Sequence, residues 1–242
     1  MLKEDERLDE LFREKMKIIQ SQSVFSFSVD ALLLANFTRL TKRTKRVMDL
    51  CSGNGIIPLL LSHRTHASID GVEIQDRVVD MAERNIVMNG KENQISIYNV
   101  DMKEIKLHFE HSTYDTITVN PPYFTNNQPV KDKGPHSIAR HEIHIDLNGV
   151  IQTARYLIKN KGRLTLVHRA ERSTEVISEL HNNGFRVRRM QYVFNDRKSE
   201  KAMFVLIEAI FNSFAYVEVM QPFYIYDESG SYTKEMLEVY YG

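Results

Sequence analysis

The sequence has little cysteine, no long hydrophobic run and no excess of charge of either sign. Cys51 is the single cysteine, so no disulfide can form within the chain, which fits a reducing compartment. The longest uninterrupted apolar runs are short, such as ALLLA at 31–35, whereas a membrane-spanning helix needs about 20 apolar residues. The highly charged start, MLKEDERLDE, is unlike a signal peptide. These features predict a cytoplasmic protein without a membrane segment.

The distribution of charge is more informative than its total. Lys+Arg and Asp+Glu both number 32, so the net charge indicates no polyanionic partner. Residues 39–46 nevertheless carry five basic residues and no acid, and residues 186–201 carry six basic and two acidic residues. Each run is typical of a solvated face, and each is also a candidate surface for nucleic acid.

Strand-like apolar runs alternate with amphipathic stretches of helix length. We expect strands at 46–50, 67–74, 94–100, 114–119, 163–168, 185–193 and 202–211, with helices at 75–89, 146–159 and 172–183. This alternation predicts an α/β, Rossmann-like fold with a mostly parallel seven-stranded sheet, an antiparallel late strand and helices on both faces. We expect one domain, with an N-terminal helical lead-in (1–40), a core (41–211) and a C-terminal extension (212–242).

Acidic residues follow three successive predicted strands, where open α/β sheets bind ligands. The first strand leads into DLCSGNG, whose Gly53 and Gly55 allow a tight turn and close approach of a ligand to the backbone. Asp49 begins this turn, and Glu73 ends the second strand 24 positions later, where a carboxylate can accept both hydroxyls of a ribose. Asp101 follows the third strand and could accept from an adenine amino group. Together these acids suit one adenosine-containing ligand.

The glycine turn distinguishes between two adenosine-containing cofactors. DLCSGNG continues as IIP and does not complete the G-x-G-x-x-G pattern, which disfavours a dinucleotide. S-adenosylmethionine has no phosphates to hold and suits the shorter turn. The single cysteine and the scattered histidines lack metal-ligand spacing, so we expect no metal.

The stretch ITVNPPYF (117–124) ends an apolar strand with Asn120, Pro121 and Pro122. An exocyclic amino nitrogen is a poor nucleophile because its lone pair is delocalised. If the Asn120 side-chain oxygen and the Pro121 carbonyl each accept one N–H, the nitrogen is drawn towards tetrahedral geometry and its lone pair can face a methyl sulfonium. The prolines fix the backbone in advance. Tyr123 can stack on a flat target group, and Phe124 can line the pocket.

NPPY after a fourth strand, with DLCSGNG before it, resembles the amino-methyltransferases that modify adenine N6 or glutamine amides with S-adenosylmethionine. Further segments resemble more specifically the bacterial tRNA1(Val) (adenine-37-N6)-methyltransferase family: FSFSVDALLLANF (25–37), GNGIIPLLLS (53–62), GVEIQ (71–75), NPPYF (120–124), ARHE (139–142) and YDESGSYTKE (226–235). The likeness spans nearly the whole chain, although many methyltransferases share the cofactor motifs. Cys51 departs from the family, which more often has a glycine there.

The resemblance implies a class I methyltransferase fold, an S-adenosylmethionine cofactor, a tRNA substrate and further site residues. Phe27 and Asp30 would close over the methionine end of the cofactor, and Cys51 would lie in its binding turn. Arg140 and His141, with Lys131 and Lys133 on the same loop, would meet RNA phosphates.

A second basic group completes the predicted RNA surface. As a hypothesis, 39–46, 131–141 and 186–201 together contact a folded tRNA, with Arg186, Arg188 and Arg189 as candidate contacts. The sequence gives no sign of an oligomeric state.

Other functions use the same tetrapeptide or the same cofactor. A glutamine-amide methyltransferase acting on a release factor would resemble this chain but carry a larger N-terminal helical domain. An rRNA guanine N2-methyltransferase remains open, since guanine also has an exocyclic amine. A DNA adenine methyltransferase would need a target-recognition region for which there is no room. A cofactor-binding module without activity is disfavoured by the intact Asn120–Tyr123 tetrapeptide.

Overall fold

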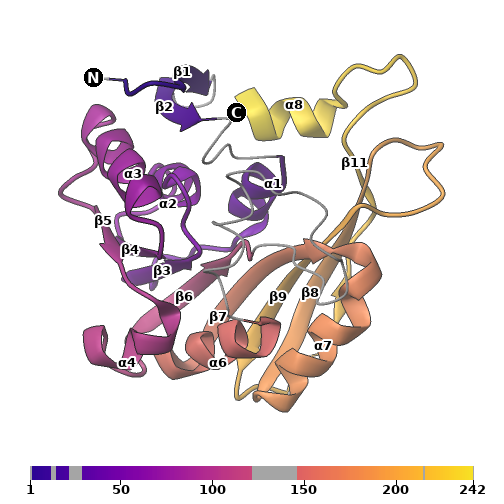
Figure 1. The fold of residues 1–242 in the computed structure, drawn as a ribbon. Coiled ribbons are helices and arrows are strands. Elements are labelled where there is room, and N and C mark those ends of the chain that lie inside the picture. The colour runs from indigo at the N-terminus through magenta and orange to yellow at the C-terminus, as the bar shows by residue number, and fades with distance from the viewer. Residues whose placement is uncertain (1, 12–14, 22–28, 122–145, 215, 242) are drawn as a thin grey trace, which may run out of the picture.

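A mixed sheet with helices on both faces forms the body of the protein (Figure 1). The computed structural model describes residues 2–11, 15–21, 29–121, 146–214 and 216–241. Within these ranges the sheet has nine strands, in the order β10-β8-β9-β7-β6-β3-β4-β5, with β11 also paired to β8. The strands are β3 (Arg46–Leu50), β4 (Ser68–Glu73), β5 (Ile95–Asn99), β6 (Tyr114–Val119), β7 (Ile158–Arg169), β8 (Phe185–Phe194), β9 (Phe204–Phe211), β10 (Glu218–Val219) and β11 (Phe223–Tyr224).

The predicted sheet is confirmed. Seven long strands are present, and β9 is the antiparallel one, because it runs opposite to both β7 and β8. The other neighbouring pairs among the long strands are parallel. The short strands β10 and β11 extend the sheet beyond the prediction by pairing in parallel with the outer edge of β8.

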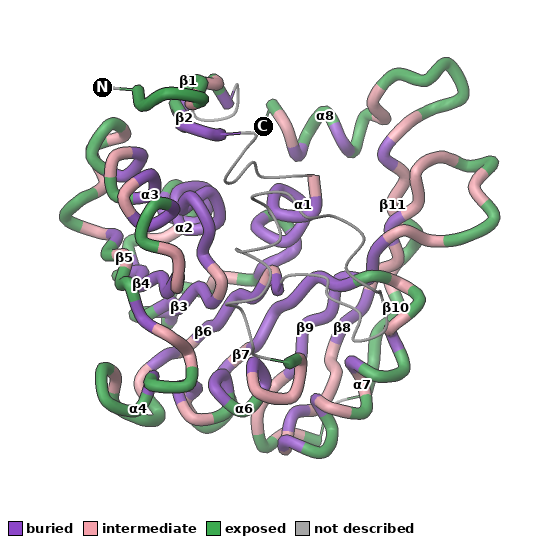
Figure 2. Tube along the Cα trace, viewed as in Figure 1, coloured by how far each residue is buried: buried purple, intermediate pink, exposed green. Residues whose placement is uncertain are grey.

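Two hydrophobic cores lie on opposite faces of the sheet. On one face pack α1 (Val29–Phe37), α2 (Ile56–Ser62) and α3 (Asp76–Met88), with α8 (Lys234–Tyr241) against α1. On the other face pack α4 (Ile105–His108), α6 (Leu147–Leu157) and α7 (Ser173–Asn182), and the single helical turns η2 (Met102–Glu104) and η3 (Ala170–Arg172) precede α4 and α7. Because the central strands are covered on both sides, they are buried along most of their length (Figure 2).

The helix α3 shows how the apolar pattern sets orientation. Val78, Val79, Ala82 and Ile86 of the predicted stripe are buried. Val87, which the prediction included, is 65% exposed. A helix turns by about 100° per residue, so the side chain after Ile86 leaves the stripe.

The predicted helical lead-in at 1–40 is wrong for its first part. Residues 6–21 form an antiparallel hairpin of β1 (Glu6–Leu11) and β2 (Met16–Ser21), and helix begins only at α1. The strand β2 buries Met16, Ile18 and Ile19 against the α3 side of the domain. Three charged residues at the start of the chain pair with α3: Lys3 with Asp80, Asp5 with Arg77, and Glu6, the first residue of β1, with Arg84.

The described part of the chain has no helix with the length and hydropathy needed to cross a bilayer. In the same part, no group of three or more His, Cys, Asp or Glu side chains is arranged to hold a metal ion.

Candidate active site

The carboxyl ends of four parallel strands meet at one edge of the sheet. Leu50, the last residue of β3, pairs with Val72 on β4 and with Val119 on β6. The residues that come next on these three strands are Cys51, Glu73 and Asn120. The structure thus brings the glycine turn, the ribose-acceptor candidate and the start of the proline pair to the same edge. Asp101 follows β5, the neighbour of β4.

The glycine turn is built from residues with left-handed backbone geometry. Cys51, Gly53 and Gly55 have φ values of 58°, 55° and 81°. Glycine adopts this geometry without strain, whereas an L side chain at the same φ is disfavoured. The conformation explains why a glycine is the more usual residue at position 51. Burial raises the pKa of the Cys51 thiol, and the nearby Glu73 and Asp49 carboxylates raise it further, so the thiol stays protonated.

Glu73 ties the end of β4 to this turn. One carboxylate oxygen accepts from the Gly53 N–H at 3.1 Å, and the other accepts from the N–H groups of Ile74 and Gln75 at 2.9 and 3.0 Å. Burial raises the pKa of Glu73, and the backbone donors oppose that rise. Each carboxylate oxygen has two lone pairs, and the oxygen bonded to Gly53 uses one of them, so it can still accept a hydroxyl of a bound ribose.

Three buried polar atoms of this turn make no hydrogen bond of good geometry within the described protein: Asp49 Oδ2, Ser52 Oγ and Asn54 Oδ1. Asp49 accepts from the Thr118 hydroxyl at 2.6 Å through Oδ1, and the Ser52 hydroxyl lies near enough to lower the pKa of Asp49. Buried acceptors are ordinarily satisfied, so Asp49 Oδ2 and Asn54 Oδ1 indicate a ligand that brings N–H or O–H donors. S-adenosylmethionine carries such donors on its amino group and ribose, and the turn residues therefore fit it.

Burial also alters the charge of Asp49. Removal from water raises the pKa of this carboxyl to about 7, the Thr118 and Ser52 hydroxyls lower it in part, and the charge of Glu73 raises it. A neighbouring positive charge would favour the ionised form.

The end of β6 supplies the next part of the site. Asn120 is half-buried, Pro121 is buried, and the neighbouring strand β7 ends with His168 and Arg169. His168 is buried and accepts from the Arg169 N–H through Nδ1 at 2.9 Å. Burial lowers the pKa of His168 to about 4, and the charge of Arg172 contributes.

The other predicted site residues have mixed outcomes. Asp30 is buried in the first turn of α1, where it accepts from the Ala31 N–H at 2.8 Å. Asp101 is partly exposed and caps η2 by accepting from the Lys103 N–H at 2.9 Å. The remaining predicted residues lie outside the described residues: Phe27, Pro122, Tyr123, Phe124, Lys131, Lys133, Arg140 and His141.

The prediction that Arg189 contacts RNA is wrong. Its side chain belongs to the core, and the residue is only 7% exposed. The guanidinium donates to the Phe37 carbonyl at 2.6 Å, lies 3.9 Å from the centre of the Phe37 ring and is 3.5 Å from the Glu208 carboxylate. Burial lowers the pKa of Arg189, and the charge of Glu208 opposes this. These contacts hold β8 and β9 against α1.

Arg186 and Arg188 are also far from the strand-end site. They lie in the first half of β8. The strand registers set Val119, the residue before Asn120, level with Met190 of β8, so at about 3.3 Å per residue Arg186 lies roughly 13 Å from that level towards the amino edge and three strands away. By contrast, the turn that follows β8 places the exposed side chains of Arg197 and Lys198 at the carboxyl edge. The guanidinium of Arg197 lies 4.8 Å from the centre of the Tyr224 ring.

Comparison with known proteins agrees with this geometry. Residues 15–193 match the family model described as methyltransferase small domain. The tRNA1(Val) (adenine(37)-N6)-methyltransferase of Tolumonas auensis is 28% identical over 178 residues, which cover 73% of each chain. The enzyme of the same name from Dyadobacter fermentans is 23% identical over 94% of this chain and 95% of its own.

Solved structures share the fold at low sequence identity. A predicted O-methyltransferase from Agrobacterium tumefaciens has a TM-score of 0.69 at 18% identity, covering 87% of this chain and 95% of its own. TYW2 of P. horikoshii, solved in complex with MeSAdo, has a TM-score of 0.61 at 13% identity, covering 88% and 74%. The chain belongs to the methyltransferase small domain family and is an S-adenosylmethionine-dependent methyltransferase.

Proposed function

We propose that this protein transfers a methyl group from S-adenosylmethionine to the exocyclic N6 of an adenine in tRNA. The observation that carries the proposal is the position of Asn120 and Pro121, at the same sheet edge as the glycine turn and Glu73. The names of the Tolumonas and Dyadobacter relatives support adenine 37 of tRNA1(Val) as the position to test first.

The residues of the chain divide the work between binding and activation. The bound cofactor supplies an electrophilic methyl group on a good leaving group. Glu73 and the glycine turn hold the ribose, and Asp49 and Asn54 offer their unpaired oxygens to donors of the cofactor. The side-chain oxygen of Asn120 and the Pro121 carbonyl each accept a hydrogen bond from one N–H group of the target amine. These two hydrogen bonds localise the lone pair on the amine nitrogen. The protonated thiol of Cys51 takes no part as a nucleophile.

Arg197 and Lys198 are the part of the predicted 186–201 surface that fits this site. They follow the carboxyl end of β8, three strands from β6 in the order β8-β9-β7-β6. At about 4.8 Å per strand, β8 is roughly 14 Å across the sheet from Asn120, and the strand registers set Val119 level with Met190, seven residues before Arg197. A tRNA whose flipped adenine lies at Asn120 can therefore extend beyond the carboxyl edge towards these two cations.

The same amine chemistry could serve a release-factor glutamine or an rRNA guanine. The test is transfer of labelled methyl groups from S-adenosylmethionine to purified bulk tRNA, rRNA and release factor. We expect label in tRNA alone, recovered as N6-methyladenosine after digestion to nucleosides. Label in rRNA or in the release factor, with none in tRNA, would overturn the proposal.

A further inference from the structure

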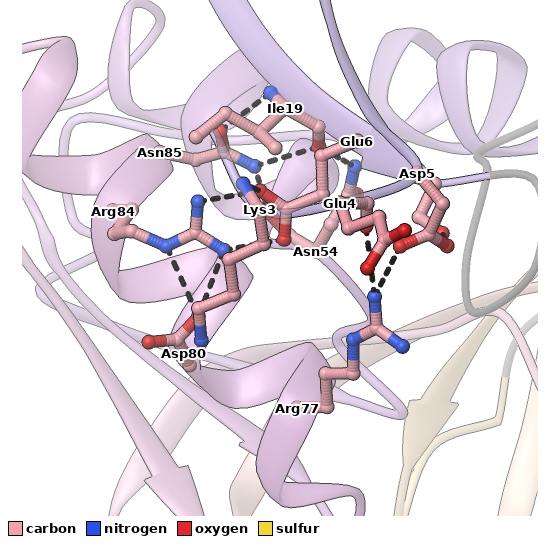
Figure 3. Close-up of polar contacts among 11 residues, drawn as sticks. Lys3, Glu4, Asp5, Glu6, Ile19, Asn54, Arg77, Asp80, Arg84 and Asn85 are labelled. Carbon is pink, nitrogen blue, oxygen red and sulfur yellow. Dashed lines mark hydrogen bonds and ion pairs between the residues drawn. The ribbon is translucent and has the colours of Figure 1, made fainter. Parts of the chain in front are cut away.

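A buried amide cluster joins the N-terminal hairpin to the glycine turn (Figure 3). Asn85 of α3 accepts from the Ile19 N–H at 2.6 Å and donates to the carbonyls of Ile19 and Asn54 at 3.2 and 3.0 Å. The side chain of Asn54 donates to the same Ile19 carbonyl at 3.0 Å. Asn54 and Asn85 are fully buried. Residues from β2, the turn and α3 thus share one network.

The network satisfies the edge of β2 that faces away from β1. In an antiparallel pair, the peptide groups of alternate residues point outward from the ladder. At Ile19 these groups bond to Asn85, and two residues earlier the N–H and carbonyl of Lys17 bond to the side chain of Asn89 at 3.0 and 2.7 Å. Asn85 and Asn89 are four residues apart, so they lie on one face of α3. The two asparagines make similar bonds to β2, but within the described residues Asn85 alone of the two also bonds to the glycine turn.

The cluster also determines which atom of Asn54 is left for a ligand. The Nδ2 donor of Asn54 is used by the Ile19 carbonyl, while its buried Oδ1 has no partner. The backbone carbonyl of Asn54 is held by Asn85, and the adjacent Gly53 N–H is held by Glu73. Both the path of the turn and the orientation of the Asn54 amide therefore depend on contacts with β2 and α3.

The ion pairs between the N-terminal segment and α3 do not involve the glycine turn. Lys3 pairs with Asp80 at 2.7 Å, and this pair is largely exposed and contributes little. Arg84 makes a bidentate pair with the buried Glu6 carboxylate, at 2.6 and 2.8 Å, and so helps to hold the hairpin on α3. Since both pairs end on α3, the asparagine cluster is the contact through which hairpin and turn depend on each other.

We propose that Asn85 is a positioning residue for the cofactor, because it holds the glycine turn at Asn54 against the N-terminal hairpin. Binding of S-adenosylmethionine and docking of the hairpin are therefore coupled. The proposal rests on the use of this cofactor and not on the identity of the methyl acceptor. A cofactor that bonds to Asn54 Oδ1 fixes the Asn54 amide and so stabilises its bond to Ile19. Conversely, loss of the hairpin contact frees that amide to rotate.

The test compares Asn85→Ala with the matched control Asn89→Ala. Both remove two bonds to β2, but only the first removes the bond to the turn. We expect calorimetry to give S-adenosylmethionine affinity about 5- to 100-fold weaker in Asn85→Ala, from the stranding of buried groups, and within about twofold of the parent in Asn89→Ala. The KM for tRNA is expected to stay unchanged in both. Equal loss of cofactor affinity in the two variants would overturn the proposal.

A second measurement needs no variant. In the parent protein, saturating S-adenosylmethionine should slow hydrogen exchange of amides in β2, including that of Ile19, because the two sites are coupled. Exchange in β9 provides the internal reference for global stabilisation. Protection of β2 no greater than that of β9 would contradict the coupling, whether or not Asn85→Ala folds.

Discussion

The two halves of the sheet use their charged residues in different ways. In the half formed by β3, β4 and β6, the buried carboxylates Asp49 and Glu73 stand at strand ends and retain acceptor capacity. In the half formed by β7, β8 and β9, Arg163 and Arg189 pair with the buried Glu208 inside the sheet. The first arrangement leaves bonding capacity for a ligand, and the second uses it to hold strands together. A charged residue therefore indicates a site only when its position on the strand is known.

The largest expected effect is at the end of β6. Asn120→Ala should lower turnover about 100-fold or more, the scale seen when one preorganised polar contact to a reacting group is removed. S-adenosylmethionine affinity should stay close to that of the parent, because the partner of Asn120 is the target amine. Steady-state kinetics with tRNA and calorimetry with the cofactor measure the two effects separately. Cofactor binding that collapsed together with turnover would make Asn120 a structural residue.

The next largest effect concerns Glu73, in the half of the sheet formed by β3, β4 and β6. Glu73→Ala should weaken S-adenosylmethionine binding by about 1–3 kcal/mol, since it strands the Gly53 N–H and removes the acceptor of the ribose hydroxyls. Glu73→Gln keeps a carbonyl acceptor and should lose less. Calorimetry checks both variants, with circular dichroism to confirm that each is folded. Unchanged affinity in Glu73→Ala would refute the ribose assignment.

A smaller effect tests the late half of the sheet. Charge reversal at Arg197 and Lys198 should raise the KM for tRNA about 10-fold. It should also reduce the slope of log affinity against log salt concentration by about one for each residue changed. The matched control is charge reversal at Arg186 and Arg188, which lie on the amino side of Met190, the β8 residue level with Val119, and should change the KM by less than about twofold. Neither pair should alter cofactor affinity. A larger effect from Arg186 and Arg188 would place the RNA along the face of β8 instead.

The last test concerns stability rather than activity: a pH dependence of unfolding that originates at Asp49. With its pKa raised to about 7 in the folded protein, this carboxyl keeps its proton between about pH 4 and pH 7, where the unfolded chain has lost it. The free energy of unfolding should therefore fall as pH rises through that range, by up to about 1.4 kcal/mol per unit, and level off above it. Asp49→Asn should remove this component. Urea unfolding across the range checks it, and an equally steep fall in the variant would assign the effect to another group.

Much of the fold could be predicted because local patterns are sufficient for it. Apolar runs bounded by turns predict the long strands, and parallel connections through helices require their carboxyl ends to share an edge. The glycine turn, Glu73 and Asn120 were therefore found from their places after strands. The hairpin of β1 and β2 could not be predicted in this way, since the bonds that hold its outer edge come from Asn85 and Asn89, more than sixty positions away.

The sequence by itself determined the positions of the long strands along the chain, the turn at 49–55, and the acidic and amide residues that follow the strands. Only the tertiary structure decided that Arg189 is a core residue, because its neighbours Phe37 and Glu208 come from distant parts of the chain. It likewise decided that Asn54 presents an unpaired oxygen, since Ile19 occupies its donor. Strand ends follow from local periodicity, whereas the partner of a polar side chain depends on which distant segments pack against it.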